Sequence, residues 1–282
     1  MKRTVIDTKH IAMNRTGTNR TGMNRVKRAA ALAALCVLAF PAFAQENPLA
    51  IVRASRDRIA AATVQSRSRW VIAAKNGSST ERLIDQYSKD DAAGRGRTVV
   101  EFREPASVAG TRFLTLDTGG GGGNQWIYLP SLGKTRRVAA SEGSGSFMGT
   151  DFSYDDISSA DRDPDLDVHT LLREENHNGK PCYVIESRPK NSSYQYSKMV
   201  LWIGKADRVN YKIELYDKRG GHVKTLEILE LKDVQGRLSP VKTRMTTLAG
   251  GSTTINVEIL RYDQAVPEAV FTPAYLETGK AR

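Results

Sequence analysis

Cysteine is nearly absent from this chain, and no apolar run is long enough to cross a membrane. Of the two cysteines in 282 residues, Cys36 lies in an N-terminal leader and only Cys182 remains beyond it. A single thiol cannot form an internal disulfide, and we expect Cys182 to be buried and inert. The longest apolar run, residues 29–40, has 12 residues, whereas a membrane-spanning helix needs about 20.

Motifs for catalysis are also missing. Gly133-Lys134-Thr135 resembles the end of a phosphate-binding loop, but Tyr128 stands where the first glycine is required. The three histidines beyond the leader show no metal-ligand spacing, and no Gly-x-Ser-x-Gly sequence is present. We therefore expect a protein that is not an enzyme and that uses no cofactor and no metal.

The aspartates between residues 161 and 167 alternate as in a calcium-binding loop. Leu166 stands where such a loop needs glycine, and Leu172 stands where it needs glutamate. The ordinary interpretation is a row of solvated acids that face Arg136 and Arg137. Weak calcium binding by this segment is the alternative that the pattern leaves open.

The first 44 residues are typical of a secretory signal peptide behind a short extension. The apolar run is followed by the small-residue cleavage site Ala42-Phe43-Ala44, and it is preceded by three positive residues, Arg25, Lys27 and Arg28. We expect cleavage after Ala44 and export of the remaining chain. The translation start is left open among three methionines, Met1, Met13 and Met23.

The leader also carries most of the basic excess. Residues 1–44 contain eight Lys or Arg and one Asp or Glu, so their removal lowers the net charge from +11 to +4. A charge of +4 on 238 residues gives no electrostatic case for a nucleic-acid partner. We expect one domain over residues 45–282.

Most of that domain alternates apolar and polar side chains with a period of two, as strands with one buried face do. Asn47-Pro48 predicts the start of a helix, whose apolar spacing continues to Ala62. Short turns between the strands predict a mainly β antiparallel meander that curls into a barrel or half-barrel. The expected strands are 67–75, 80–89, 97–105, 110–117, 124–129, 134–139, 168–175, 181–188, 197–204, 208–217, 222–234, 240–248 and 252–263.

Residues 124–157 combine an aromatic strand, a basic strand and a small-residue loop that still carries large apolar groups. Exposed apolar side chains contribute no burial energy, so we expect this loop to cover or enter an apolar surface. The cavity and lid candidates are Phe102, Phe113, Trp126, Tyr128, Phe147, Met148, Phe152, Tyr154 and Trp202.

Each of these candidates has a plainer alternative. Trp126, Tyr128 and Trp202 are of residue types that pack in cores more often than they contact ligands. An arginine pair suits a phosphate or a partner's carboxylates, but it also suits an ordinary polar strand face. The polar candidates for partner contact are Arg136, Arg137 and Asp151.

Together, several motifs are similar to those of the LolA-like outer-membrane lipoprotein-sorting proteins. The most specific is residues 145–156, Gly-Ser-Phe-Met-Gly-Thr-Asp-Phe-Ser-Tyr-Asp-Asp. The resemblance covers nearly the whole chain beyond the leader. Its other motifs are residues 99–105, 110–114, 126–130, 134–138, 201–203 and 271–276, with Tyr196, Gly221, Lys224 and Thr225.

The resemblance implies a LolA/LolB-like unclosed half β-barrel in the periplasm of a Gram-negative cell, with helices at the mouth of an apolar cavity. It implies a carrier that binds lipid or lipoprotein acyl chains for transfer from the inner to the outer membrane. Each buried methylene contributes about 0.8 kcal/mol, so a dry cavity holds such a chain without covalent bonds. A mobile lid at residues 139–157 would make the binding reversible.

Members of this branch resemble accessory proteins of inner-membrane exporters of the resistance-nodulation-division (RND) type. An RND-type transporter and an outer-membrane acceptor are therefore the implied partners. The alternative is a lipid- or lipoprotein-sensing module on the same fold, and a hydrolase is less favoured because no nucleophile–base motif is present. We expect serine at Phe147, Met148 and Phe152 to weaken fatty-acid uptake with little change in melting temperature.

Overall fold

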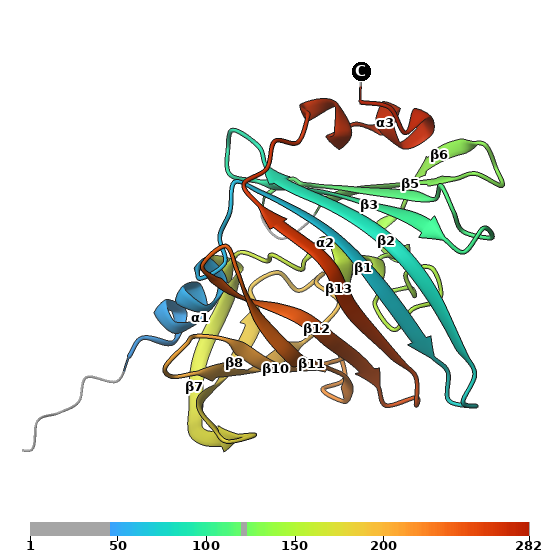
Figure 1. Ribbon diagram of the computed structural model, residues 1–282. Helices are drawn as coiled ribbons and strands as arrows, with labels where there is room; N and C mark the ends of the chain where they lie inside the picture. Colours follow the sequence, from blue (N-terminus) through green and yellow to red (C-terminus); the bar gives the residue numbers. More distant parts are fainter. Residues whose placement is uncertain (1–45, 120–122, 282) are drawn as a thin grey trace, which may run out of the picture. The chain divides into compact units, whose positions relative to one another are not determined.

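The computed structural model describes residues 46–119 and 123–281 (Figure 1). The predicted extension, signal peptide and cleavage site lie outside these residues. In the described part, thirteen strands form one antiparallel sheet. The strands are β1 (Thr63–Ala73), β2 (Ser79–Asp90), β3 (Gly96–Glu104), β4 (Arg112–Asp117), β5 (Gly123–Leu129), β6 (Lys134–Arg137), β7 (Asp167–His177), β8 (Lys180–Pro189), β9 (Lys198–Gly204), β10 (Asn210–Tyr216), β11 (His222–Val234), β12 (Arg237–Thr247) and β13 (Ser252–Tyr262).

The sheet is a meander of consecutive hairpins, interrupted where β1 pairs with β13. The spatial order is β6-β5-β4-β3-β2-β1-β13-β12-β11-β10-β9-β8-β7, and Trp70 of β1 lies opposite Ile255 of β13. Strands β6 and β7 therefore become the two edges, and the curved sheet is not closed into a barrel. The predicted mainly β, unclosed fold is confirmed, and each expected strand lies within a few residues of an observed one.

The N-terminal helix α1 (Pro48–Asp57) begins as the sequence predicts. The Leu49 backbone N–H donates to the Asn47 carboxamide oxygen at 2.9 Å, and Pro48 occupies the first helical position. The helix ends earlier than Ala62, because the Ala62 N–H donates to the Asp263 carboxylate at 2.8 Å and the chain then enters β1. None of the helices in residues 46–119 and 123–281 has the length and hydrophobicity of a membrane span.

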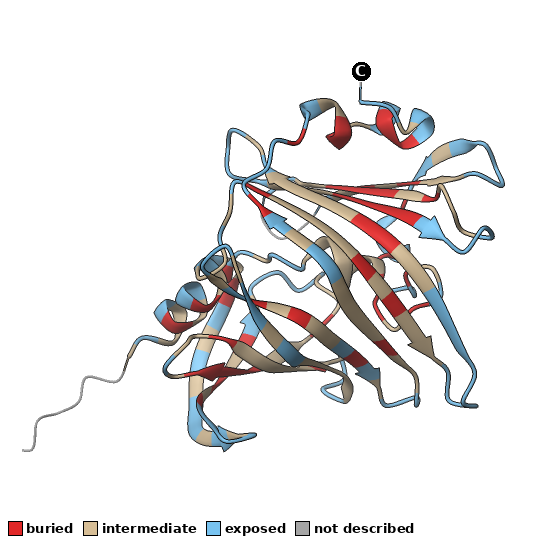
Figure 2. Ribbon diagram, viewed as in Figure 1, coloured by how far each residue is buried: buried red, intermediate tan, exposed pale blue. Residues whose placement is uncertain are grey.

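Buried residues occur along most strands of the sheet and in the C-terminal elements (Figure 2), and they divide into different cores on its two faces. On β3, Val100 and Phe102 belong to one large cluster, whereas Val99 belongs to another. We call the first face the inner face and the second the outer face. The inner cluster is made of the buried residues Trp70, Ile84, Val100, Phe102, Phe113, Ile127, Val138, Phe147, Phe152, Tyr196, Leu215 and Met245.

Short elements cover both faces. On the inner face, Ile51 of α1 packs against Ile185, Leu201 and Ile203 of β8 and β9. On the outer face of β3 and β4, the C-terminal elements η3 (Glu268–Phe271) and α3 (Pro273–Thr278) pack against strand residues such as Val99. Between β6 and β7 the chain forms η1 (Ala140–Glu142), α2 (Tyr154–Ser158) and η2 (Pro164–Leu166).

Candidate functional site

Residues 139–157, the cover segment, lie against the inner face of β1–β5 without forming a strand of the sheet. The chain turns back on itself between Ser146 and Ser153, where the Phe147 N–H donates to the Phe152 carbonyl at 2.7 Å. Met148 and Gly149 form the tip of this turn with φ of +52° and +77°, a region that suits glycine. The residues that flank this tip, Phe147 and Phe152, present their side chains to the sheet from an irregular backbone.

Phe147 is the centre of an aromatic cluster. Its ring is fully buried, and its centroid lies 5.1 Å from that of Phe113 and 5.7 Å from that of Phe102. The Tyr154 ring approaches it edge-on at 5.3 Å, and the Trp70 ring lies 6.4 Å away. Edge-to-face and tilted contacts at these distances stabilise aromatic pairs beyond simple burial.

The cover segment fills the space where we expected an empty cavity under a lid. Phe102 and Phe113 are completely buried beneath it, and Phe152 contacts Trp70 with a ring separation of 5.5 Å. The physical reason is that each buried phenylalanine stabilises the fold by about 1.5–3 kcal/mol, so an aromatic loop enters an apolar hollow rather than spanning it. Because Phe147 is fully buried, we now expect serine at this position to lower the melting temperature, in place of the small change expected from the sequence.

Beside this filled region, the inner face remains apolar and only partly buried. Side chains of the central strands pack against the inner cluster without being enclosed by it. They come from strands β9, β10, β11 and β13, and they are Met199, Ile213, Leu226 and Ile255. An apolar strip therefore runs from the aromatic cluster toward the cluster around Ile51 of α1, against which Met199 and Ile213 also pack.

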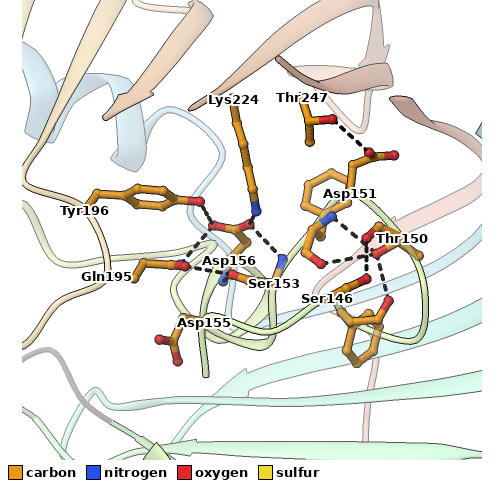
Figure 3. A network of polar contacts seen from close by, with 12 residues as sticks. Ser146, Thr150, Asp151, Ser153, Asp155, Asp156, Gln195, Tyr196, Lys224 and Thr247 are labelled. Carbon is orange, nitrogen blue, oxygen red and sulfur yellow. Dashed lines mark hydrogen bonds and ion pairs between the residues drawn. The ribbon is translucent and has the colours of Figure 1, made fainter. Parts of the chain in front are cut away.

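Polar contacts hold the cover segment in place (Figure 3). The Asp156 carboxylate receives the Lys224 ammonium of β11 at 2.7 Å and the Tyr196 hydroxyl at 2.8 Å. It also accepts from the Gln195 amide at 3.0 Å and from the Ser153 N–H at 2.8 Å, so that α2 starts in a capping box. A buried carboxylate with this many donors is fully satisfied.

A second polar contact fixes the turn itself. The Asp151 carboxylate accepts from the Thr253 hydroxyl of β13 at 2.7 Å, and the Asp151 N–H donates back to that hydroxyl oxygen at 3.0 Å. The Thr247 hydroxyl lies 3.4 Å from the same carboxylate. Asp151 was predicted to contact a partner, and in this structure its contacts are to β12 and β13.

Asp155 is a carboxylate whose charged form is disfavoured by its position in the fold. It is partly buried and accepts one side-chain hydrogen bond, from the Gln125 amide at 3.1 Å. Burial raises the pKa of the Asp155 carboxyl, and this outweighs the hydrogen bond from Gln125. Burial also raises the pKa of Tyr194 nearby to about 12, so its hydroxyl is a neutral donor or acceptor at neutral pH.

The structure brings six of the nine cavity and lid candidates together and separates the other three. Phe102, Phe113, Phe147, Met148, Phe152 and Tyr154 meet at the inner cluster. Trp126 and Tyr128 pack on the outer face, against the cluster that contains residues of η3 and α3. Ile127 lies between them and faces inward, since successive side chains of a strand point to opposite faces of the sheet. Trp202 lies in a third cluster with Cys182 and Val184, so it too is outside this site.

The remaining predicted residues have local partners. Arg136 pairs with Glu142 at 2.8 Å, and Arg137 donates to the Asn124 side chain. The aspartates between residues 161 and 167 do not face this arginine pair; their partners are Arg56, Arg53 and Arg162. No group of three metal-binding side chains occurs in the described residues. Cys182 is fully buried, as expected, and burial raises the pKa of its thiol.

Sequence reasoning missed two cationic residues of this face. Arg82 of β2 shares the inner face with Trp70, which lies directly opposite on β1. Lys224 belonged to a motif of the resemblance, but its contact with Asp156 spans 68 residues of sequence. The alternation of Arg82, Ile84 and Gln86 along β2 was the one signal that could have placed the arginine inside.

The described residues form an unclosed antiparallel sheet with a LolA-like fold. The predicted resemblance to the LolA-like outer-membrane lipoprotein-sorting proteins is confirmed by the structural neighbours. A family model described as "Uncharacterized protein" matches residues 94–278, and the chain belongs to that family. No curated protein sequence matches the chain.

Three crystal structures show the likeness in detail. A DUF1329 family protein from Desulfovibrio piger is 28% identical with a TM-score of 0.77, over 81% of this chain and 97% of that one. A domain from Vibrio parahaemolyticus, described as an outer membrane lipoprotein-sorting protein, is 29% identical with a TM-score of 0.76, over 82% and 98%. A LolA superfamily protein from Nitrosomonas europaea, at 20% identity, TM-score 0.66 and coverage of 82% and 100%, shares the fold.

Proposed function

We propose that this protein is a non-enzymatic periplasmic carrier that binds lipid or lipoprotein acyl chains on its inner face. The observation that supports this proposal most is the way in which that face is closed. Over β1–β5 the apolar surface is closed by the cover segment, an irregular chain whose rim contacts are polar, rather than by a second sheet. The similarity to a lipoprotein-sorting domain from Vibrio parahaemolyticus supports the same class of cargo.

Exchange between the cover segment and an acyl chain is energetically balanced. Withdrawing Phe147 and Phe152 from the cluster costs about 1.5–3 kcal/mol for each side chain. An acyl chain recovers about 0.8 kcal/mol for each methylene that it buries. A stretch of about four to eight methylenes therefore offsets both phenylalanines, and binding remains reversible.

The partly buried strip offers a starting point for this exchange. An acyl chain placed along Met199, Ile213 and Leu226 would contact apolar side chains before the cover segment moves. Its end would then reach Phe152 and Trp70, where displacement of the segment begins. The segment can leave the inner face without breaking strand pairing, because it contributes no strand to the thirteen-stranded sheet.

The proposal includes transfer from the inner to the outer membrane, with an RND-type transporter as donor and an outer-membrane acceptor. Support for these two partners comes from the resemblance of this branch to exporter accessory proteins. Export to the periplasm is supported by the signal-peptide pattern of residues 1–44.

Trp70 provides the test, because among the three tryptophans of the chain it alone belongs to the inner cluster. A brominated fatty acid quenches tryptophan fluorescence on contact. We expect it to quench the wild-type protein and Trp126→Phe and Trp202→Phe variants, but to lose its effect in Trp70→Phe. Quenching that survives Trp70→Phe would place the chain elsewhere, and an absence of both quenching and co-purified lipid would refute carriage.

A further inference from the structure

Arg82 places an unpaired positive charge on the inner face. It lies on β2 directly opposite Trp70, which belongs to the inner cluster. Among the described residues no carboxylate lies within ion-pairing distance of its guanidinium, and its Nη1 atom is buried without a hydrogen-bond partner. A buried donor without a partner lowers the stability of the fold by about 1–3 kcal/mol, so its presence needs an explanation.

Arginines on the opposite face of the same strands are paired. Arg67 of β1 lies 2.7 Å from the Asp85 carboxylate, and Arg69 lies 3.0 Å from Glu258. Arg103 of β3 reaches both Asp85 at 2.7 Å and Glu101 at 3.0 Å. The outer face thus supplies an acid for each of these cations, whereas the inner face supplies none for Arg82.

The surroundings of Arg82 are apolar on one side and open on the other. Its guanidinium carbon lies 5.7 Å from the centre of the Phe102 ring, at the heart of the aromatic cluster. On the other side is the turn of the cover segment, where a Cβ on Gly149 would lie 3.8 Å from Nη2. Gly149 is exposed to solvent, so an anion can approach the guanidinium along this turn.

The turn also offers further donors. Within the described residues, the backbone N–H groups of Met148 and Gly149 donate no hydrogen bond. Both residues have positive φ, and successive N–H groups in such turns form concavities that bind anions. A guanidinium donates two parallel hydrogen bonds to a pair of phosphate or carboxylate oxygens. It keeps its charge even when burial lowers its pKa, as burial does for Arg82.

We infer that Arg82 binds the anionic headgroup, phosphate or carboxylate, of a lipid whose acyl chain lies on the inner face. This inference rests on the proposed function. The contact with Phe102 favours a lipid over free phosphate, because a ligand here meets a cation and an aromatic cluster together. The headgroup would pair the orphaned donors while its chain replaces the aromatic side chains of the cover segment.

The experiment compares ligands that share one acyl chain. Hexadecyl phosphate, the uncharged hexadecyl glucoside and inorganic phosphate are titrated into the purified protein, with displacement of a fluorescent fatty acid as the readout. We expect hexadecyl phosphate to bind the wild-type protein about tenfold more tightly than the glucoside, as one charge-assisted contact supplies. Arg82→Gln should bind both lipids alike, and Arg82→Lys should keep part of the preference.

Arg69→Gln is the matched control, since it removes the same charge from the adjacent strand on the outer face, and it should keep the full preference. Equal binding of both lipids by the wild-type protein would overturn the inference while leaving the carrier function standing. A preference that survives in a folded Arg82→Gln would overturn it as well. Tight binding of inorganic phosphate without competition from lipid would identify a free-phosphate site, and failure of both lipids to bind would refute the carrier function itself.

Discussion

Lys224 Nζ lies 2.7 Å from Asp156 Oδ2, and this ion pair ties β11 to the cover segment. The two side chains are only 18% and 8% exposed, so water screens the pair weakly. The Tyr196 hydroxyl completes the site from the far side of the same carboxylate (Figure 3). The cover segment is thus held by an ionic contact at α2 and by aromatic packing at Phe147.

Replacing Lys224 by methionine should loosen the cover segment. The change leaves Asp156 without its ionic partner but with the Tyr196 hydroxyl, so we expect a loss of about 2 kcal/mol, below the full cost of orphaning a buried charge. Fatty-acid binding should become faster, because the segment leaves the inner face more readily. Urea unfolding and stopped-flow fluorescence measure the two effects.

Lys212→Met is the control for this change. Lys212 forms a 2.8 Å ion pair with Glu214 of similar exposure, and it lies over the Trp202 ring, away from the cover segment. We expect it to leave the binding rate unchanged. Equal acceleration by both variants would mean that Lys224 has no particular hold on the segment.

Phe147 should behave as a core residue and Met148 as a rim residue. Phe147→Ala removes a completely buried ring with four aromatic neighbours, so we expect a loss of about 3–5 kcal/mol in unfolding free energy. Met148 is only partly buried, and Met148→Ser should cost about 1 kcal/mol or less. Thermal melts compare the two, and similar melting temperatures would contradict the packing described above.

Asp155 should make the protein less stable as pH rises. Because burial raises the pKa of this carboxyl in the folded state, its contribution is fully present below the unfolded pKa of about 3.9 and is lost as pH rises through the folded value. Asp155→Asn should therefore gain stability relative to wild type between pH 4 and pH 7. Urea unfolding at both pH values tests the sign.

Asp263→Asn provides the opposite case. Hydrogen bonds from the Ala62 N–H and from Arg237 lower the pKa of the Asp263 carboxyl, so its stabilising contribution is present above the unfolded pKa and is lost on acidification. This variant should lose stability relative to wild type as pH rises from about 2 to about 5, the range in which the wild-type carboxylate becomes charged. Parallel pH profiles for the two variants would show that burial of Asp155 does not govern its titration.

Arg112 should anchor the C-terminal helix to the outer face. Its Nη1 donates to the Leu276 carbonyl at 2.9 Å, and its Nε donates at 3.0 Å to the buried carboxylate of Glu101. Arg112→Met removes both contacts, and we expect a loss of about 3 kcal/mol and faster amide exchange in α3. Arg188→Met, which breaks an exposed pair with Glu186, should cost about 0.5 kcal/mol.

The positions of the strands followed from local information. Alternation along β10 at Tyr211, Ile213 and Leu215, and glycine-containing turns such as Gly220-Gly221, depend on neighbours a few residues apart. The Asn47-Pro48 helix start was equally local. These features could be predicted because the backbone preference of a residue and the exposure of its side chain both show in a pattern of residues a few positions apart in the sequence.

The faces of the strands were harder to predict. Trp126, Ile127 and Tyr128 are all apolar, so alternation alone does not say which of them faces the inner cluster. The answer depends on Tyr275 and Leu276, which cover the outer face from almost 150 residues away in the sequence. A strand that is covered on both sides loses the contrast on which the pattern relies.

The aromatic loop and its need for an apolar surface followed from the residues alone, because phenylalanine side chains that stay in water contribute no burial free energy. The fold settles the partners: Phe147 fills the hollow, Lys224 meets Asp156, and among residues 46–119 and 123–281 no carboxylate pairs with Arg82. Each of these depends on which strands the meander brings together through the β1–β13 pairing. The tendency of a side chain to be buried follows from its residue type. Which side chain it meets depends on the order of the strands in the sheet.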